Sequence, residues 1–205
     1  SIQLDPQRIE RLRRYCELLW EWNRKLNLTR HLDYETFVVR DLVDTQHLAE
    51  HLRPKLRVLD IGSGGGVPGL LLAILRPDLQ VTLSESMRKK AHALEEILRQ
   101  LELPIPVKAS RAEAVLKQTH YDLLVARAVG PMWKMLRWLA PHWNAFDQLL
   151  LVKGPRWVEE RLEARHRGQL RHLDLRRLAE YPTPGHSGQN VILSLTRKPE
   201  TSDRD

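Results

Sequence analysis

The segment RVLDIGSGGGVPGLLLAIL, residues 57–75, constrains the fold of this chain more than any other. An apolar run of strand length is followed by four glycines within five residues, and then by an apolar run of helical length. Because glycine has no side chain, it adopts positive φ easily and lets a backbone approach another molecule closely. In open α/β sheets, ligands bind beyond the carboxyl ends of the strands, where such a turn lies. The segment therefore predicts a strand, a ligand-binding turn and a helix.

The rest of the chain continues this alternation of strand and helix patterns. Apolar runs between turn residues predict strands at 57–61, 80–84, 105–109, 121–126 and 148–152, and helices at 67–75, 87–101, 111–117 and 131–140. Such alternation is typical of a parallel sheet with helices on both faces. Two more strands, near 170–180 and at 190–196, flank the turn-rich PTPGHSGQ loop and predict an antiparallel hairpin at one edge. The predicted fold class is α/β, with a doubly wound, Rossmann-like, mostly parallel sheet.

The first fifty residues have helical periodicity instead. Ile9, Leu12 and Cys16 recur at the spacing of one helix face, and a second helix is expected over 35–52, before Pro54. We therefore expect three parts: a helical N-terminal extension over 1–54, a main domain over 55–198 and a tail over 199–205.

Composition narrows the class of protein. The chain has 205 residues, of which 42% are hydrophobic, and these values are ordinary for a soluble globular protein. No apolar run approaches the roughly 20 residues that cross a bilayer, and the start lacks a signal-peptide pattern. The single cysteine, Cys16, excludes a disulfide framework. We expect a cytoplasmic protein, a monomer, that does not bind a membrane.

The charge of the chain favours a polyanionic partner. The formal net charge is +7, and arginines gather in 8–30 and in 156–177, where seven arginines face four acids. We interpret 161–177 as a helix with an exposed charged face. Phosphate contact remains the alternative, because arginine suits bidentate phosphate binding.

The glycine spacing excludes two common phosphate-binding loops. No Gly-Lys-Ser/Thr follows the turn, and a dinucleotide-binding fingerprint would need glycine where Val67 lies. The remaining common occupant is S-adenosylmethionine, although a turn that only joins strand and helix is the alternative. Asp60 would reach ordered water or the ammonium group of this cofactor, and Glu85, after the next strand, would reach the ribose hydroxyls. The turn itself is formed by Gly62, Gly64 and Gly66.

Seven motifs over nearly the whole chain resemble those of one family. They are WEWNRKLNLT (20–29), VVRDLVDT (38–45), LDIGSGGGVPGLLLA (59–73), LSESMRKKAHAL (83–94), SRAEA (110–114), VARAV (125–129) and LVKG (151–154). In this order they resemble the RsmG/GidB family of guanine-N7 methyltransferases of small-subunit (16S) ribosomal RNA. The resemblance implies a class I methyltransferase sheet, S-adenosylmethionine as cofactor, and small-subunit ribosomal RNA or the 30S subunit as partner. Residues 55–198 would then be the methyltransferase domain.

The resemblance also implies roles for individual residues. Gly62 and Val67 would contact the cofactor, and Ala112 and Glu113 would flank its adenine. The two candidate catalytic residues are Arg127, near both cofactor and incoming base, and Lys153, on the substrate side. Four more residues would border the substrate pocket: Asn27, Thr29, Arg40 and Asp44.

Two positions depart from the family pattern. Asp41 replaces a histidine of the family's second motif, and Gln189-Asn190 replaces an Arg-His pair before the last strand. Both changes remove cationic or ring groups from the face expected to meet RNA. They leave two alternatives open: a non-catalytic, cofactor-binding RNA-binding homologue, and a methyltransferase with another nucleic-acid or small-molecule acceptor.

The chemistry of guanine-N7 methylation is compatible with these residues. N7 carries a free lone pair, so a direct displacement needs alignment but no general base. Methylation of pyrimidine carbon 5 needs a cysteine near the fourth or fifth strand, whereas Cys16 lies on the expected N-terminal helix. Methylation of adenine amino groups generally uses an Asp/Asn-Pro-Pro-aromatic turn after the fourth strand, where this chain has RAVGPMW (127–133).

Two other patterns are interpreted as structural. HLAEH (47–51) matches a zinc-protease pattern but lacks an evident third ligand, so no metal is expected. We interpret Trp133, Trp138 and Trp143 as core residues, with base stacking as the alternative.

Overall fold

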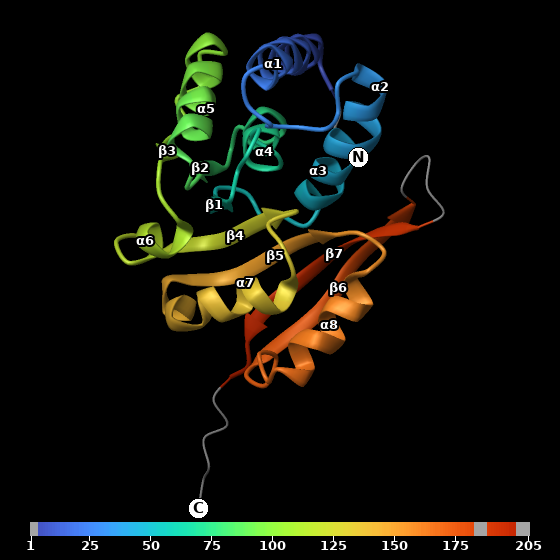
Figure 1. Ribbon diagram of the computed structural model, residues 1–205, viewed down its shortest axis with the longest axis vertical. Coiled ribbons are helices and arrows are strands. Elements are labelled where there is room, and N and C mark those ends of the chain that lie inside the picture. Colours follow the sequence, from blue (N-terminus) through green and yellow to red (C-terminus); the bar gives the residue numbers. More distant parts are fainter. Residues whose placement is uncertain (1–3, 183–187, 200–205) are drawn as a thin grey trace, which may run out of the picture.

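The computed structural model describes residues 4–182 and 188–199 (Figure 1). Over these residues the strands form one seven-stranded sheet of order β3-β2-β1-β4-β5-β7-β6. Neighbours among β1 to β5 pair in parallel, whereas β7 pairs antiparallel with both β5 and β6. This confirms the predicted α/β class and the terminal hairpin. The strands are β1 (Arg57–Ile61), β2 (Gln80–Ser84), β3 (Val107–Lys108), β4 (Tyr121–Arg127), β5 (Phe146–Lys153), β6 (Leu173–Pro182) and β7 (Gln189–Arg197).

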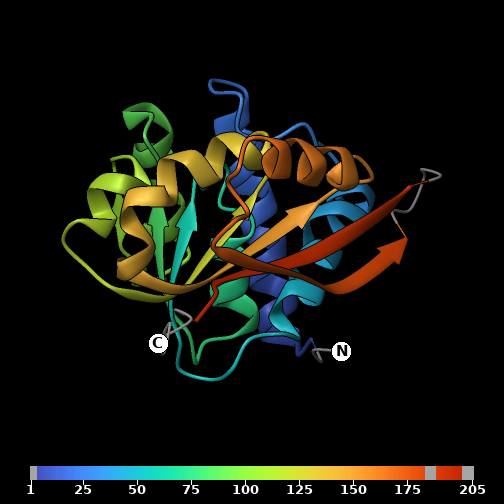
Figure 2. The ribbon, with the colours of Figure 1, turned by 90° about the horizontal axis from the view of Figure 1, so that it is seen from below.

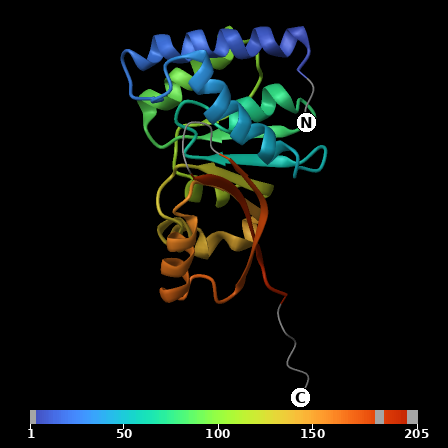
Figure 3. The ribbon, with the colours of Figure 1, turned by 90° about the vertical axis from the view of Figure 1, so that its right-hand side faces the viewer.

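Helices cover both faces of the sheet, and Figure 3 shows the resulting three layers. One face carries α1 (Pro6–Asn23), α2 (Tyr34–Phe37), the π-helix η1 (Val38–Leu42), α3 (Val43–Ala49), α4 (Gly69–Leu75) and α5 (Arg88–Gln100). The other carries α6 (Ala112–Leu116), α7 (Met132–Leu139), the 3-10 helix η2 (Ala140–Ala145) and α8 (Trp157–His166). None of the helices in the described ranges combines the length and the apolarity needed to cross a membrane.

The core divides into two clusters, one on each face of the sheet. In β4, Leu123 and Val125 belong to the cluster beneath α1, α3, α4 and α5, whereas Leu124 and Ala126 belong to the cluster over α6 and α7. Successive side chains of a strand point to opposite faces, so a strand covered on both sides is apolar at consecutive positions. This is why the central strands appear in the sequence as continuous apolar runs.

The predicted second helix is observed with a distortion in its middle. Asp33 caps its start by accepting a hydrogen bond from the backbone N–H of Thr36, at 2.7 Å. One π-helical turn, η1, then interrupts the α-helical pattern, and the helix ends at Ala49, before the expected position 52. Single π-turns inside α-helices are rare and often occur at functional sites. Here the π-turn contains Arg40, which lines the second cavity described below, and Asp41, which is buried.

The prediction of a helix over 161–177 is wrong. Helix α8 ends at His166, and Gly168 follows with φ of +75°, a conformation that commonly terminates helices. Beyond it, the chain enters β6, where buried Leu173 is followed by more exposed residues. The strand expected over 105–109 is reduced to the two residues of β3. Pro106 lies directly before them and lacks the N–H that a strand interior needs.

Strands β6 and β7 form the hairpin at one edge of the sheet. Figure 2 shows β6 and β7 running out past the other strands toward their connection. Most of the PTPGHSGQ loop, residues 183–187, and the tail beyond 199 lie outside the described residues. The expected boundary at residue 54 stays a prediction.

Candidate active site

The glycine turn after β1 is fastened to the end of β2. The backbone N–H groups of Gly62 and Ser63 donate to the carbonyl oxygen of Ser84, at 2.9 and 3.0 Å. Gly64 donates to Oε2 of Glu85 at 3.0 Å. Gly62, Gly64 and Gly66 have φ of +66°, +55° and +102°, so glycine is required for this backbone path. The predicted turn at the carboxyl ends of two adjacent strands is confirmed.

The other glycines of the motif allow close packing of protein on protein. A Cβ at Gly65 would lie 2.9 Å from Cδ1 of Leu19, and the hydroxyl of Tyr15 donates to the carbonyl oxygen of Gly65 at 2.7 Å. A Cβ at Gly69 would lie 2.5 Å from Cδ2 of Leu83. The N-terminal helix α1 therefore supports the turn from behind, and only part of the glycine content serves the cavity in front.

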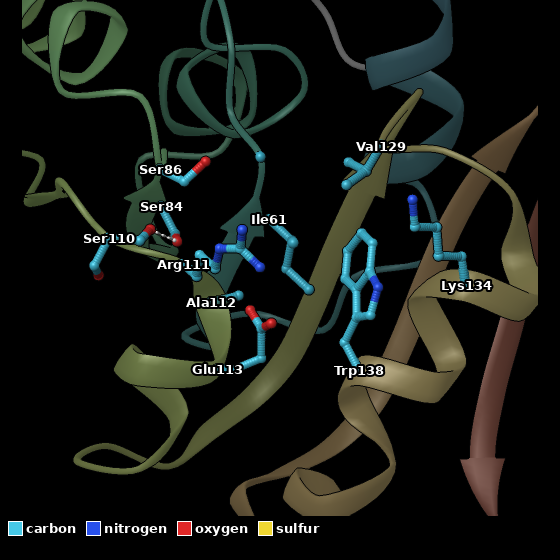
Figure 4. A pocket seen from close by; sticks show the side chains of 11 residues that line it. Ile61, Ser84, Ser86, Ser110, Arg111, Ala112, Glu113, Val129, Lys134 and Trp138 are labelled. Atoms are coloured by element: carbon cyan, nitrogen blue, oxygen red, sulfur yellow. Dashed lines mark hydrogen bonds between the residues drawn. The ribbon is translucent and has the colours of Figure 1, made fainter.

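A cavity of about 360 Å³ opens in front of this turn (Figure 4). This volume lies within the roughly 300–1,000 Å³ of small-molecule sites. Arg111 and Glu113 extend into view from one side, and Lys134 and Trp138 of α7 from the other (Figure 4). The remaining lining residues come from the carboxyl ends of the strands and from the segments that follow them: Ile61, Gly62, Ser84, Ser86, Ser110, Ala112 and Val129.

Three of the predicted cofactor residues, Gly62, Ala112 and Glu113, line this first cavity. Sequence reasoning missed Lys134 and Trp138, although their spacing of four residues on α7 places them on one helix face. The other predicted cofactor residues do not line it; Gly66 packs against Leu70 and Leu94, and Val67 packs against the core cluster.

Glu85 connects the turn to the segment after β2. Its side chain is buried, with Oε2 accepting from Gly64 and Oε1 accepting from the N–H of Met87 at 2.8 Å. Each carboxylate oxygen has a second lone pair. The contact of Glu85 with a ribose therefore stays a prediction, whereas its support of the turn is observed.

Asp60 lies beneath the turn, fully enclosed. Its Oδ2 accepts from the N–H of Gly69 at 3.2 Å, and its buried Oδ1 has no partner among the described residues. Burial raises the pKa of Asp60 to about 7, because a charged carboxylate is costly away from water. The expected contact of Asp60 with water or an ammonium group stays a prediction.

A second cavity, of about 430 Å³, lies on the other side of the segment that follows β4. Val129 lines the first cavity, whereas Ala128 and Gly130 line the second, so the two cavities share segment 127–130 as a wall. The other residues around the second cavity come from far apart in the chain: His31, Arg40, Asp44, Arg127, Val152, Lys153, Gly154, Glu160 and Asn190.

Arg127 is held by two carboxylates in this second cavity. Its NH1 donates to Asp44 Oδ2 at 2.9 Å and to the carbonyl oxygen of Arg40 at 3.1 Å, while NH2 pairs with Asp41. Burial acts to lower the pKa of Arg127, but the charges of Asp41 and Asp44 outweigh it and raise the pKa above the ordinary value. The guanidinium is therefore a fixed, permanent cation.

Asp41 and Asn190, from the two positions that depart from the family pattern, both contact the group of charges around Arg127. Asp41 is buried beside Arg127, and its two oxygens lie 2.9 Å from Nδ1 of His31. Asp44 Oδ1 accepts from the Asn190 amide and from the Tyr181 hydroxyl, each at 2.8 Å. The charge of Asp41 is therefore buried and paired, and the expected loss of cationic and ring groups from the face that meets RNA stays a prediction.

Lys153 lies on the opposite side of the second cavity. Its buried Nζ donates to the carbonyl oxygen of Gly130 and to Glu160 Oε2, both at 2.7 Å. Of the other predicted substrate residues, Arg40 and Asp44 also line this cavity. Asn27 and Thr29 do not; Asn27 is exposed, and Thr29 Oγ1 accepts from the N–H of His31 at 3.0 Å.

The tryptophans and the first histidine of HLAEH (47–51) have packing contacts. Trp133, Trp138 and Trp143 pack against the core cluster under α7, which confirms their core role, and Trp138 has a cavity face as well. His47 stacks on Tyr181, with ring centroids 3.9 Å apart. Within 4–182 and 188–199, no group of three or more ligating side chains is placed to hold a metal ion.

The strand order and the cavity at the glycine turn define a Rossmann-like, doubly wound fold with a candidate ligand site beyond the carboxyl ends of its parallel strands. A family model, GidB, described as rRNA small subunit methyltransferase G, matches residues 8–182. The chain belongs to this family.

Known proteins agree with this assignment. A Rhodopirellula baltica protein named Ribosomal RNA small subunit methyltransferase G is 49% identical over 203 residues, 99% of this chain and 88% of that protein. A protein of the same name from Chromobacterium violaceum is 38% identical over 162 residues, covering 78% of this chain and 77% of its own. Among solved structures, a variant of MtNAS in complex with S-adenosylmethionine has a TM-score of 0.60 at 16% identity, covering 92% of this chain and 72% of its own, and supports the fold.

Proposed function

We propose that this protein transfers the methyl group of S-adenosylmethionine to N7 of a guanine in small-subunit ribosomal RNA. Family membership supports the reaction class and the substrate class. The structural observation that supports methyl transfer is the pair of cavities that share segment 127–130 as a wall. Transfer between two bound molecules requires such adjacent sites.

The residues of the first cavity fit the cofactor. Gly62 offers bare backbone, and a Cβ there would lie 3.2 Å from Cγ2 of Val129, so a larger residue would narrow the cavity. Ile61 and Trp138 offer apolar walls for a ring, and Glu113 offers a carboxylate acceptor. When bound, the cofactor supplies a methyl group on a positively charged sulfur.

The second cavity fits a base that attacks without losing a proton. A bond forms from guanine N7 to the methyl carbon, the carbon–sulfur bond breaks, and its electron pair remains on sulfur. The protein therefore has to orient the base and exclude water, and orientation alone contributes up to roughly 7–11 kcal/mol in favourable cases. Arg127, fixed by Asp41 and Asp44, is suited to hold O6 or a phosphate. A donor on N7 itself would block attack.

Incubation of the pure protein with hypomethylated small subunits and labelled cofactor tests the proposal. We expect label in the RNA, at one N7-methylguanosine on modification mapping. Label in another macromolecule would contradict the substrate, and binding of cofactor by calorimetry without turnover on free RNA or subunits would support the non-catalytic alternative. Gly62→Val is the negative control, because its side chain would meet Val129 in a strained backbone conformation.

A further inference from the structure

Glu160 of α8 is a cavity residue that the sequence did not single out. Its Oε2 accepts from Lys153 Nζ and from the backbone N–H of Met132, both at 2.7 Å. Met132 is the first residue of α7, where unpaired N–H groups favour a negative charge. Two donors on one oxygen, one of them charged, hold the carboxylate in a single orientation.

The second oxygen of Glu160 remains available to the second cavity. Among the described residues, both hydrogen bonds to the side chain of Glu160 end on Oε2, and this side chain is 27% exposed. Asp44 is the other carboxylate that lines this cavity, but it already accepts from Arg127, Tyr181 and Asn190. Glu160 is therefore the acidic group best placed to meet a ligand there.

An ionised carboxylate only accepts hydrogen bonds, so it selects ligands that offer donors. The Watson–Crick edge of guanine offers two, the ring N1–H and the exocyclic amino group. Adenine has a lone pair at N1 instead, which a carboxylate repels. N7 lies on another edge of the purine, so a group that binds the Watson–Crick edge leaves N7 free to react.

We propose that Glu160 reads the Watson–Crick edge of the acceptor guanine through Oε1, which accepts from the ring N1–H and from the exocyclic amino group. This inference rests on the proposed function, because it assigns the second cavity to the acceptor base. Lys153 acts in the same arrangement by compensating the charge of Glu160 and fixing its orientation.

The variant Glu160→Gln separates base reading from a purely structural role. Lys153 Nζ and the Met132 N–H are both donors, so they fix the oxygen of the introduced amide at the Oε2 position. The amide NH₂ then faces the cavity, where it opposes the donors of guanine. Glu159→Gln is the matched control, because Glu159 is the exposed neighbour that pairs with Arg156.

The experiment compares kcat/KM on RNA that carries guanosine or inosine at the mapped nucleotide. Inosine keeps N7 but lacks the exocyclic amino group. We expect the wild type and Glu159→Gln to favour guanosine by about ten- to a hundredfold, the range for a hydrogen bond to a charged group. In Glu160→Gln this preference should fall to about twofold or less, while cofactor affinity measured by calorimetry stays within about twofold of the wild type.

Two results would overturn the inference without touching the proposed function. One is a wild type that methylates both RNAs equally well, a result that does not depend on the folding of any variant. The other is a Glu160→Gln protein that loses activity on both RNAs by the same factor. A wild type that methylates no RNA would instead overturn the proposed function, and the inference with it.

Discussion

The two cavities are built in different ways. Apart from Lys134 and Trp138 of α7, the first is lined by residues within a few positions of the strand ends, and its glycine turn is held by Ser84 and Glu85. The second is made of side chains that converge from distant segments, as in the contact of Asp44 with Asn190, 146 residues apart. A site of local backbone geometry tolerates few substitutions at its glycines, whereas a site of converging charges depends on every partner remaining paired.

The largest expected loss of stability comes from removing a charge of the second cavity. Asp44→Ala removes the acceptor of Arg127, Tyr181 and Asn190 together and leaves a buried cation half compensated. Removing one partner of a buried ion pair typically costs about 3–5 kcal/mol, so we expect the free energy of unfolding to fall by that amount in urea denaturation. Asp174→Ala, in an exposed pair with Arg176, should cost less than about 1 kcal/mol. Equal losses in both variants would refute the network.

The turn should respond to pH through Asp60. Its pKa is raised to about 7 in the folded protein, against about 3.9 in an unfolded chain. Between these values the folded protein keeps a proton on Asp60 that the unfolded chain has released. The contribution of Asp60 to the free energy of unfolding therefore falls as pH rises toward 7 and becomes level above that pH.

Asp60→Asn cannot ionise and should remove this dependence. From pH 5 to pH 8, the unfolding free energy of the wild type minus that of the variant should fall by about 3 kcal/mol. Denaturation curves at the two pH values measure it. A difference that stays constant or rises would mean that the Asp60 carboxyl is not buried as described.

A charge-preserving change at Arg127 should weaken activity on RNA and leave cofactor binding nearly unchanged. Lysine cannot make the same forked contacts with Asp41 and Asp44. We expect Arg127→Lys to lower kcat/KM for RNA by about ten- to a hundredfold. Cofactor affinity in calorimetry should change by less than about threefold, because Arg127 does not line the first cavity. An equal loss in cofactor affinity would place Arg127 at the cofactor instead.

The smallest expected effect is on the support behind the turn. Tyr15→Phe removes the hydroxyl that donates to Gly65 and should cost about 1–2 kcal/mol of stability, since a buried carbonyl loses its partner. Tyr34→Phe is the control, because Tyr34 is 46% exposed. Thermal unfolding of the two variants measures the difference, and equal midpoints would exclude the contact with Gly65.

The sequence predicted the first cavity better than the second for a physical reason. Parallel strands bring their carboxyl ends to one edge, so the proximity of Gly62 to the segment after β2 followed from strand spacing alone. Ala112 and Glu113 came from the family resemblance, and they too line the first cavity.

Nothing in the spacing indicated that Asp44 would meet Tyr181, or that Glu160 would meet the start of α7. Those contacts depend on how the edge hairpin and α8 pack, which periodicity does not specify. The same limit explains the incorrect helix over 161–177, where α8 ends at His166, Gly168 follows with positive φ, and β6 begins at Leu173. The buried pairing of Asp41 was missed because its partner His31 lies outside the helix that carries it.

The most direct test of the two-cavity account is a crystal structure of the protein with S-adenosylhomocysteine and a guanosine-containing RNA fragment. We expect the cofactor product over Gly62, between Glu113 and Trp138, and the guanine beside Lys153, on the opposite side of segment 127–130. Cofactor density in the second cavity, or a base bound away from both, would contradict this expectation.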